Sequence, residues 1–151
     1  MKDSTWWPAK LPHVVDHKVQ MTYRQDDGTL QAGPYPFPMD HSMESGGSGL
    51  LTTAKDYATF MQAFLAGKLL KGETMDLMFT PQLDEHQEKM LNEVGDEFHE
   101  GFKPEFPKGL GIQHGIGGII NMEDCPEKRT KGSMSWSGFL NSRWVGAKVC
   151  Q

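Results

Sequence analysis

The amino-acid sequence predicts an α+β domain in which antiparallel strands are packed with helices. Two observations lead to this class: an amphipathic helical pattern follows a glycine-rich turn at 45–49, and two strand-like segments occupy 109–123 and 131–144. The chain has 151 residues, so we expect one domain over residues 1–151. Hydrophobic residues make up only 37%, with 17 glycines and 9 prolines, which predicts a thin core and a loop-rich or incomplete fold.

The first 45 residues are interrupted by prolines, which remove backbone donors and fix φ, so long regular elements are excluded there. The five prolines are Pro8, Pro12, Pro34, Pro36 and Pro38. Within this region, Asp27-Gly28 lies between two alternating runs at 18–31. That dipeptide is typical of a tight turn with positive φ, and it predicts a short hairpin.

The clearest element is an amphipathic helix that begins after Thr53 and stops at Gly67. Thr53 and Asp56 have the spacing of a capping box, in which the hydroxyl and the carboxylate satisfy backbone donors of the first turn. The apolar residues that follow have helical spacing: Tyr57, Phe60, Met61, Phe64 and Leu65. A second short helix is expected at 72–79, before Pro81.

The next segment, 84–109, is dense in charge and contains Pro104 and Pro107 near its end. We expect it to be partly helical and to end in a solvated loop. Residues 109–123 combine glycine with β-branched residues and predict one strand, connected by the loop at 124–131 to a second, antiparallel strand.

That second strand, "KGSMSWSGFLNSRW" at 131–144, has serine at every second position. Alternation places Ser133, Ser135 and Ser137 on one face and Met134 and Trp136 on the other. The pattern predicts a face that meets something polar. The alternative is an edge strand whose serines face solvent.

Charge and composition exclude several classes of protein. The net charge of -5, with both signs scattered, argues against a nucleic-acid partner. Without an apolar run of roughly 20 residues or a secretory leader, we expect no membrane association and a cytoplasmic location. Cys125 and Cys150 lack metal-ligand spacing and are expected to be buried or free thiols.

Several motifs invite a cofactor or metal site. His13 and His17 are four residues apart, as in zinc hydrolases, but Pro12 and two valines weaken the helix that would align them. The glycine clusters at 45–49 and 109–118 lack the nucleotide-binding patterns, although an anion at the first one stays possible because a helix follows it. We therefore expect no metal and no cofactor.

Serine chemistry also lacks its usual motifs. The sequence contains no G-x-S-x-G, S-x-x-K or Y-x-N pattern. Thr52 and Lys55 have the spacing of S-x-x-K, but capping of the helix start explains Thr52 better. No residue of this chain is therefore assigned as catalytic.

Five segments together, in order, resemble the later part of the serine β-lactamase-related family. They are "MKDSTWWP", "YRQDDGTL", "GPYPFPMD", "ESGGSGLLTTAKDYATFMQAFLAGK" and "KGSMSWSGFLNSRW". The family includes class C β-lactamases, penicillin-binding carboxypeptidases, related esterases and fungal acyltransferases. The loop before the serine strand is most similar to the fungal branch. The resemblance implies a partial β-lactamase/transpeptidase-like fold, incomplete at both ends.

The resemblance also implies roles for the serine strand. Family members have a Lys-Thr-Gly-like or Trp-Gly-Gly-like triplet beside the active site, and Trp136, Ser137 and Gly138 match it here. The N–H of Phe139 would match an oxyanion-hole donor, and Ser137 would hydrogen-bond an acyl or carboxylate group. These four residues are the expected substrate-binding and oxyanion residues.

The family's nucleophilic serine, lysine and tyrosine lie upstream of the matched part. The expectation is a C-terminal fragment of a serine hydrolase or acyltransferase that acts on a small-molecule ester or amide through an acyl-serine intermediate. Alone, the chain is expected to be inactive. The alternative is a non-catalytic remnant that binds a ligand or partner through Ser133, Ser135 and Ser137.

Overall fold

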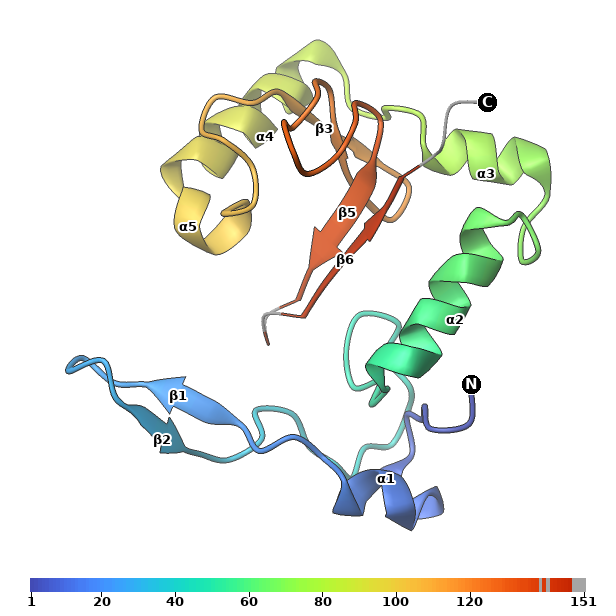
Figure 1. Ribbon diagram of the computed structural model, residues 1–151, viewed down its shortest axis with the longest axis vertical. Coiled ribbons are helices and arrows are strands. Elements are labelled where there is room, and N and C mark those ends of the chain that lie inside the picture. Colours follow the sequence, from blue (N-terminus) through green and yellow to red (C-terminus); the bar gives the residue numbers. More distant parts are fainter. Residues whose placement is uncertain (139, 141, 148–151) are drawn as a thin grey trace. The chain divides into compact units, whose positions relative to one another are not determined.

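The computed structural model describes residues 1–138, 140 and 142–147. The chain divides into two compact units, Met1–Phe60 and Met61–Gln151. Both units combine helices with antiparallel strands, as the α+β prediction requires (Figure 1). No helix of the described residues is long and apolar enough to cross a bilayer.

The first unit is built from short elements. It contains the 3-10 helix η1 (Pro8–Lys10), helix α1 (Pro12–Asp16) and a hairpin of β1 (Thr22–Arg24) and β2 (Leu30–Ala32). Gly28 has a φ of 83° in the connecting turn, which confirms the predicted hairpin. All residues of both strands are exposed, and the only buried residues of this unit are Pro8 and Asp56.

Helix α2 (Ala54–Leu65) begins where the sequence predicts. The N–H of Asp56 donates to Thr53 Oγ1 at 3.1 Å, which is one half of the expected capping box. The other half differs, because Asp56 Oδ2 accepts from the N–H of Asp3 and from the hydroxyl of Ser4, each at 2.8 Å. The cap therefore also fixes the N-terminal segment to the helix start.

The second unit continues with α3 (Gly72–Met78), α4 (Glu85–Glu97) and α5 (His99–Phe102). Asp84 caps α4 in a capping box with Gln87. The expected solvated loop after these helices is wrong for Lys103 and Phe106, which are buried, whereas residues 107–109 are exposed. Phe106 and Leu110 join the hydrophobic core, so this loop is a structural part of the unit.

A four-stranded antiparallel sheet forms the centre of the second unit (Figure 1). Its order is β3 (Ile112–Gly115), β4 (Gly118–Asn121), β5 (Met134–Ser137) and β6 (Arg143–Gly146). The segment predicted as one strand at 109–123 is a hairpin, with Gly117 in the turn at a φ of 109°. The predicted antiparallel pairing with the serine strand is confirmed, through β4.

The two faces of this sheet bury separate cores. On one face, Ile112 and Ile119 pack with Phe106, Leu110 and Cys125, and Leu91 of α4 and Phe102 of α5 cover them. On the other face, Phe64 of α2 and Met75 of α3 pack against Ile120 and Met134. Strand alternation explains why the neighbours Ile119 and Ile120 enter different cores.

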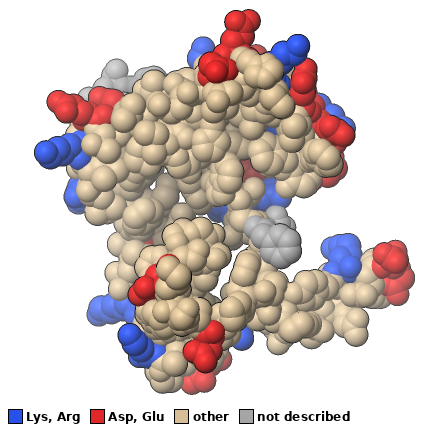
Figure 2. All heavy atoms as spheres, turned by 180° about the vertical axis from the view of Figure 1, so that it is seen from behind, with Lys and Arg blue, Asp and Glu red and all other residues tan. Residues whose placement is uncertain are grey.

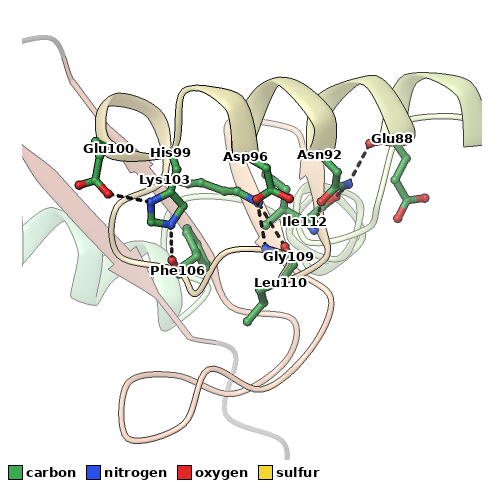
Figure 3. A network of polar contacts seen from close by, with 10 residues as sticks. All are labelled: Glu88, Asn92, Asp96, His99, Glu100, Lys103, Phe106, Gly109, Leu110 and Ile112. Atoms are coloured by element: carbon green, nitrogen blue, oxygen red, sulfur yellow. Dashed lines mark hydrogen bonds and ion pairs between the residues drawn. The ribbon is translucent and has the colours of Figure 1, made fainter.

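Polar contacts join α4 to the sheet and to the loop that follows α5 (Figure 3). The side-chain amide of Asn92 pairs with the backbone of Ile112 in β3. Its Nδ2 donates to the carbonyl of Ile112 at 2.8 Å, and its Oδ1 accepts from the N–H of Ile112 at 2.9 Å. The buried Lys103 forms an ion pair with Asp96 at 2.7 Å. The hydrogen bond from Lys103 lowers the pKa of Asp96.

Charged side chains of both signs are interspersed on the face shown in Figure 2. On that face, no continuous basic stripe is visible among the coloured residues.

Candidate functional site at the end of strand β5

The structure places the predicted triplet at the C-terminal end of β5. Trp136 and Ser137 are the last two residues of the strand, and Gly138 follows directly. Phe139, the predicted oxyanion donor, lies outside the described residues. The predicted site residues that the structure describes are therefore contiguous along one strand end.

Of the serine face, only Ser137 stays accessible. Ser133 is 1% exposed, and its hydroxyl donates to the carbonyl of Thr130 at 2.8 Å. Ser135 is 6% exposed. A ligand that contacts all three serines is therefore incompatible with this structure. The face is buried against the core that contains Ile119, whereas Trp136 on the opposite face is 42% exposed.

The pairing of β5 differs between its two edges. Pairing with β4 ends at Ser135, which lies opposite Ile119. Pairing with β6 continues through Ser137, which lies opposite Arg143. Beyond that pair, the N–H of Gly138 donates to the carbonyl of Ser142 at 2.8 Å. Within the described chain, the last residues of β5 thus have a strand partner on one edge only.

This one-sided pairing sets the direction of the backbone groups. Because the N–H of Gly138 points toward β6, alternation points the N–H and carbonyl of Ser137 toward the opposite edge. An open strand edge of this kind can accept an extended ligand by backbone hydrogen bonds. The local arrangement therefore combines an open edge, a hydroxyl and an exposed indole.

Gly138 adds no side chain to this strand end. A Cβ at this position would lie 2.9 Å from Ser142 Oγ, so the hydroxyl would have to turn away. The ring of Trp136 and the ring of His114 meet edge to face, with centroids 5.5 Å apart. The indole is thereby partly fixed in orientation while staying accessible.

A small cavity lies on the other side of the strand end, with a volume of about 20 Å³, room for about one water molecule. Ser135 and Ser137 contribute to its wall. The rest of the lining comes from Trp136, Ile119, Arg143 and the segment 102–106.

The strongest electrostatic feature beside this cavity is Glu105. Its Oε2 accepts from Arg129 Nη2, and its Oε1 accepts from Arg143 Nη1 at 3.0 Å. Partial burial opposes ionisation of this carboxyl, but the hydrogen bonds from the two arginines outweigh it and lower the pKa of Glu105. Glu105 is therefore an anion between two cations at neutral pH.

Sequence reasoning did not identify Glu105, Arg129, Arg143 or His114 as part of this site. Arg143 is 38 residues from Glu105 along the chain, and no local pattern connects such distant positions. The only sequence clue was the inclusion of Arg143 in the strand-like run at 131–144.

The alternative metal site does not assemble. His13 Nε2 lies 3.1 Å from Asp3 Oδ1, while His17 Nδ1 lies 2.8 Å from the carbonyl of His13, so the two rings have separate partners. Among the described residues, no group of three or more His, Cys, Asp and Glu side chains could hold a metal ion. Cys125 is a buried free thiol as expected, and Cys150 lies outside the described residues.

Comparison with curated proteins gives fungal acyltransferases and an esterase. The chain is 31% identical to an acyltransferase, mokF, from Monascus pilosus over 150 residues, which cover 95% of this chain and 36% of that protein. It is 30% identical to a lovastatin esterase from Penicillium rubens over 106 residues, which cover 66% of this chain and 26% of that protein. The matched part of the chain thus spans between about a quarter and a third of the length of these relatives.

A solved structure agrees with this similarity. The LovD6 mutant of simvastatin synthase from Aspergillus terreus superposes with a TM-score of 0.87 at 31% identity, over 97% of this chain and 37% of that chain. No family model matches the sequence. The strand order, the matched relatives and the shared fold agree with the expected partial β-lactamase-like architecture. The chain belongs to the serine β-lactamase-related family and corresponds to the C-terminal portion of its fungal acyltransferase branch.

Proposed function

We propose that these 151 residues form the substrate-side part of a serine acyltransferase or hydrolase that acts on small-molecule esters or amides. The observation on which this rests is the end of β5, where Trp136, Ser137 and Gly138 extend past the last residue paired with β4. The names of the relatives support the reaction class, since they describe acyl transfer and ester cleavage. An acyl-serine intermediate serves both reactions.

In this proposal each residue of the strand end has a distinct role. The open edge at Ser137 aligns the acyl group of the substrate, and the Ser137 hydroxyl donates to an oxygen of that substrate. The N–H of Phe139 stabilises the oxyanion that develops during acyl transfer. One such donor lowers the barrier by about 3–4 kcal/mol in an intact serine enzyme. Trp136 offers an apolar surface to the substrate beside the strand.

The attacking groups in this reaction come from outside the 151 residues, because neither S-x-x-K nor Y-x-N occurs within them. An oxyanion donor without a nucleophile and a base has little chemistry to assist. We therefore expect the isolated chain to bind a substrate-like amide and to turn over no ester.

The decisive experiment measures binding and turnover separately on the 151-residue chain. Butyranilide, a stable aryl amide, should bind saturably, and Gly138→Trp should abolish that binding by obstructing the strand end. Gly46→Trp is the matched control, because no atom lies within 4 Å of a Cβ at Gly46. Absence of binding at millimolar butyranilide would contradict the proposal.

Turnover tests the location of the nucleophile. The chain should not hydrolyse p-nitrophenyl butyrate above the buffer rate. Hydrolysis that disappears with Ser137→Ala would show a nucleophile within these residues and would overturn the assignment. The intact mass of the endogenous protein gives a second test, because an antibody against 84–100 captures the exposed face of α4. A mass well above 16.9 kDa would support an upstream nucleophile.

A second candidate function is ligand or partner binding without catalysis. It is favoured by the presence of the open β5 edge in a sequence that lacks the attacking motifs. An endogenous protein of 16.9 kDa that binds butyranilide and shows no turnover would favour this function over catalysis.

A further inference from the structure

Glu105 connects three segments that are distant in sequence. Its side chain is 29% exposed and contacts Arg129, which is 6% exposed, and Arg143, which is 33% exposed. Its carbonyl accepts from Lys128 Nζ at 2.9 Å. Side chain and backbone of one residue thus hold the loop at 124–131 and strand β6 together.

The Arg129 side of this cluster is rigid. The guanidinium lies over the ring of Phe106, 4.7 Å from its centroid, and Phe106 is itself buried in the core. A buried ion pair with a stacked arginine has few alternative geometries. Arg129 therefore fixes the carboxylate of Glu105 in place.

The Arg143 side reaches the proposed substrate strand. Arg143 is the direct cross-strand neighbour of Ser137, and the next contact along the ladder joins Gly138 to Ser142. Any movement of the first residue of β6 consequently moves the end of β5. The same Arg143, Glu105 and Ser137 also line the small cavity, so the contact lies directly beside the strand end.

We propose that Glu105 is a positioning residue, whose carboxylate holds Arg143 and thereby fixes the backbone of Ser137 and Gly138 for substrate binding. This inference rests on the proposed function of β5. Glu105 does not touch the substrate; it acts through Arg143. Arg129 supplies the second cation that keeps the carboxylate ionised and oriented.

Two readouts on the nitrogen-15-labelled chain test the proposal. The first is amide exchange of Gly138, measured against the core amide of Ile120, and it needs no ligand. The second is the dissociation constant for butyranilide. Glu105→Gln should accelerate exchange of Gly138 by about tenfold while Ile120 exchanges as before, because the charge-assisted contact that holds Arg143 is lost. Binding of butyranilide should weaken by about the same factor.

Glu93→Gln is the matched control, because Glu93 is an exposed glutamate of α4 whose ion pair with Lys89 does not involve the sheet. It should change neither readout. Arg143→Gln should reproduce the effect of Glu105→Gln at Gly138, and the double variant should add nothing further there, because Glu105 reaches the strand end through Arg143.

The outcomes separate this inference from the function on which it rests. If butyranilide does not bind but Glu105→Gln still accelerates Gly138 alone, the function fails and the positioning contact stands. If butyranilide binds and neither Glu105→Gln nor Arg143→Gln changes either readout, the positioning role is overturned. Equal acceleration at Gly138 and Ile120 in both single variants would also overturn it, since Glu105 would then only stabilise the fold.

Discussion

The hairpin of the first unit and the sheet of the second unit use the same antiparallel pairing but differ in what stabilises them. Both strands of the β1–β2 hairpin are exposed throughout, whereas all four residues of β4 are buried. The sheet separates two apolar cores, while the first unit buries only Pro8 and Asp56. Strand pairing therefore determines the backbone conformation in both units. Apolar burial determines which unit has the larger free energy of unfolding.

The largest effect is expected in the sheet. Ile120 is 1% exposed and packs with Phe64, Met75 and Met134. Ile120→Ala should lower the free energy of unfolding of the second unit by about 2–5 kcal/mol, because it removes buried methylene groups and leaves a cavity. Urea unfolding followed by amide signals of β4 measures this loss. A change below about 0.5 kcal/mol would mean that the sheet does not depend on this core.

A smaller effect is expected where α4 contacts the sheet edge. Asn92→Ala removes both hydrogen bonds to the backbone of Ile112 (Figure 3). The free energy of unfolding should fall by about 1–3 kcal/mol, because the N–H of the buried Ile112 loses its partner. The same urea titration measures it. Lys89→Ala, on the exposed surface of α4, is the control and should be nearly neutral.

The first unit buries few residues, and the hydrogen bonds that Asp56 accepts from Asp3 and Ser4 help to stabilise it. Their contribution depends on pH. Burial raises the pKa of Asp56, but the N–H of Asp3 and the hydroxyl of Ser4 outweigh this and hold it below the ordinary 3.8. The contact therefore stabilises the first unit fully above pH 3.8 and loses its effect as the pH falls through the lowered value. The amide shift of Asp3 should titrate with a midpoint below 3.8.

Asp56→Asn provides the control for that titration. The amide of Asp3 should then show no midpoint in the same range, because the partner no longer ionises. A midpoint at or above 3.8 in the unmodified chain would contradict the direction of the pKa shift.

The smallest effect is expected in the hairpin. Leu30 of β2 is 62% exposed although it is apolar and lies in a strand. Leu30→Ala should change the free energy of unfolding by less than about 0.5 kcal/mol. A loss comparable to that of Ile120→Ala would show that the hairpin has an apolar partner, and the contrast between the two units would disappear.

Local sequence patterns were sufficient for elements whose signals lie within a few residues. The start of α2 after Thr53 and the turn at Gly28 were predicted, because capping and turn patterns are short-range. Alternation also predicted β5, but the run expected as one strand at 131–144 was wrong in length: β5 ends at Ser137, and Arg143 begins β6. The triplet Trp136-Ser137-Gly138 was placed on a strand end by the family resemblance. Its role in binding substrate stays a prediction.

Other features depend on contacts that no short pattern encodes. The β3–β4 hairpin was interpreted as one strand, because its turn at Gly117 lies within a glycine-rich run that looks continuous. The loop containing Phe106 was expected to be solvated, since its charges and prolines dominate the local composition. The Glu105–Arg143 pair joins residues 38 positions apart, so only the folded sheet reveals it.

The two apolar faces of the sheet create a problem of strand register. A shift of β4 by one residue would exchange Ile119 and Ile120 between the cores, and hydrophobicity alone would penalise this weakly. Asn121 opposes the shift, because its fully buried Nδ2 donates to the carbonyls of Glu123 and Thr130 at 2.7 and 2.9 Å. Gly118 opposes it as well, since a Cβ there would lie 2.8 Å from the carbonyl oxygen of Ser135. The side-chain amide of Asn121 and the absence of a Cβ at Gly118 thus select one alignment of the strands. This alignment keeps Ser137 at the open end of β5.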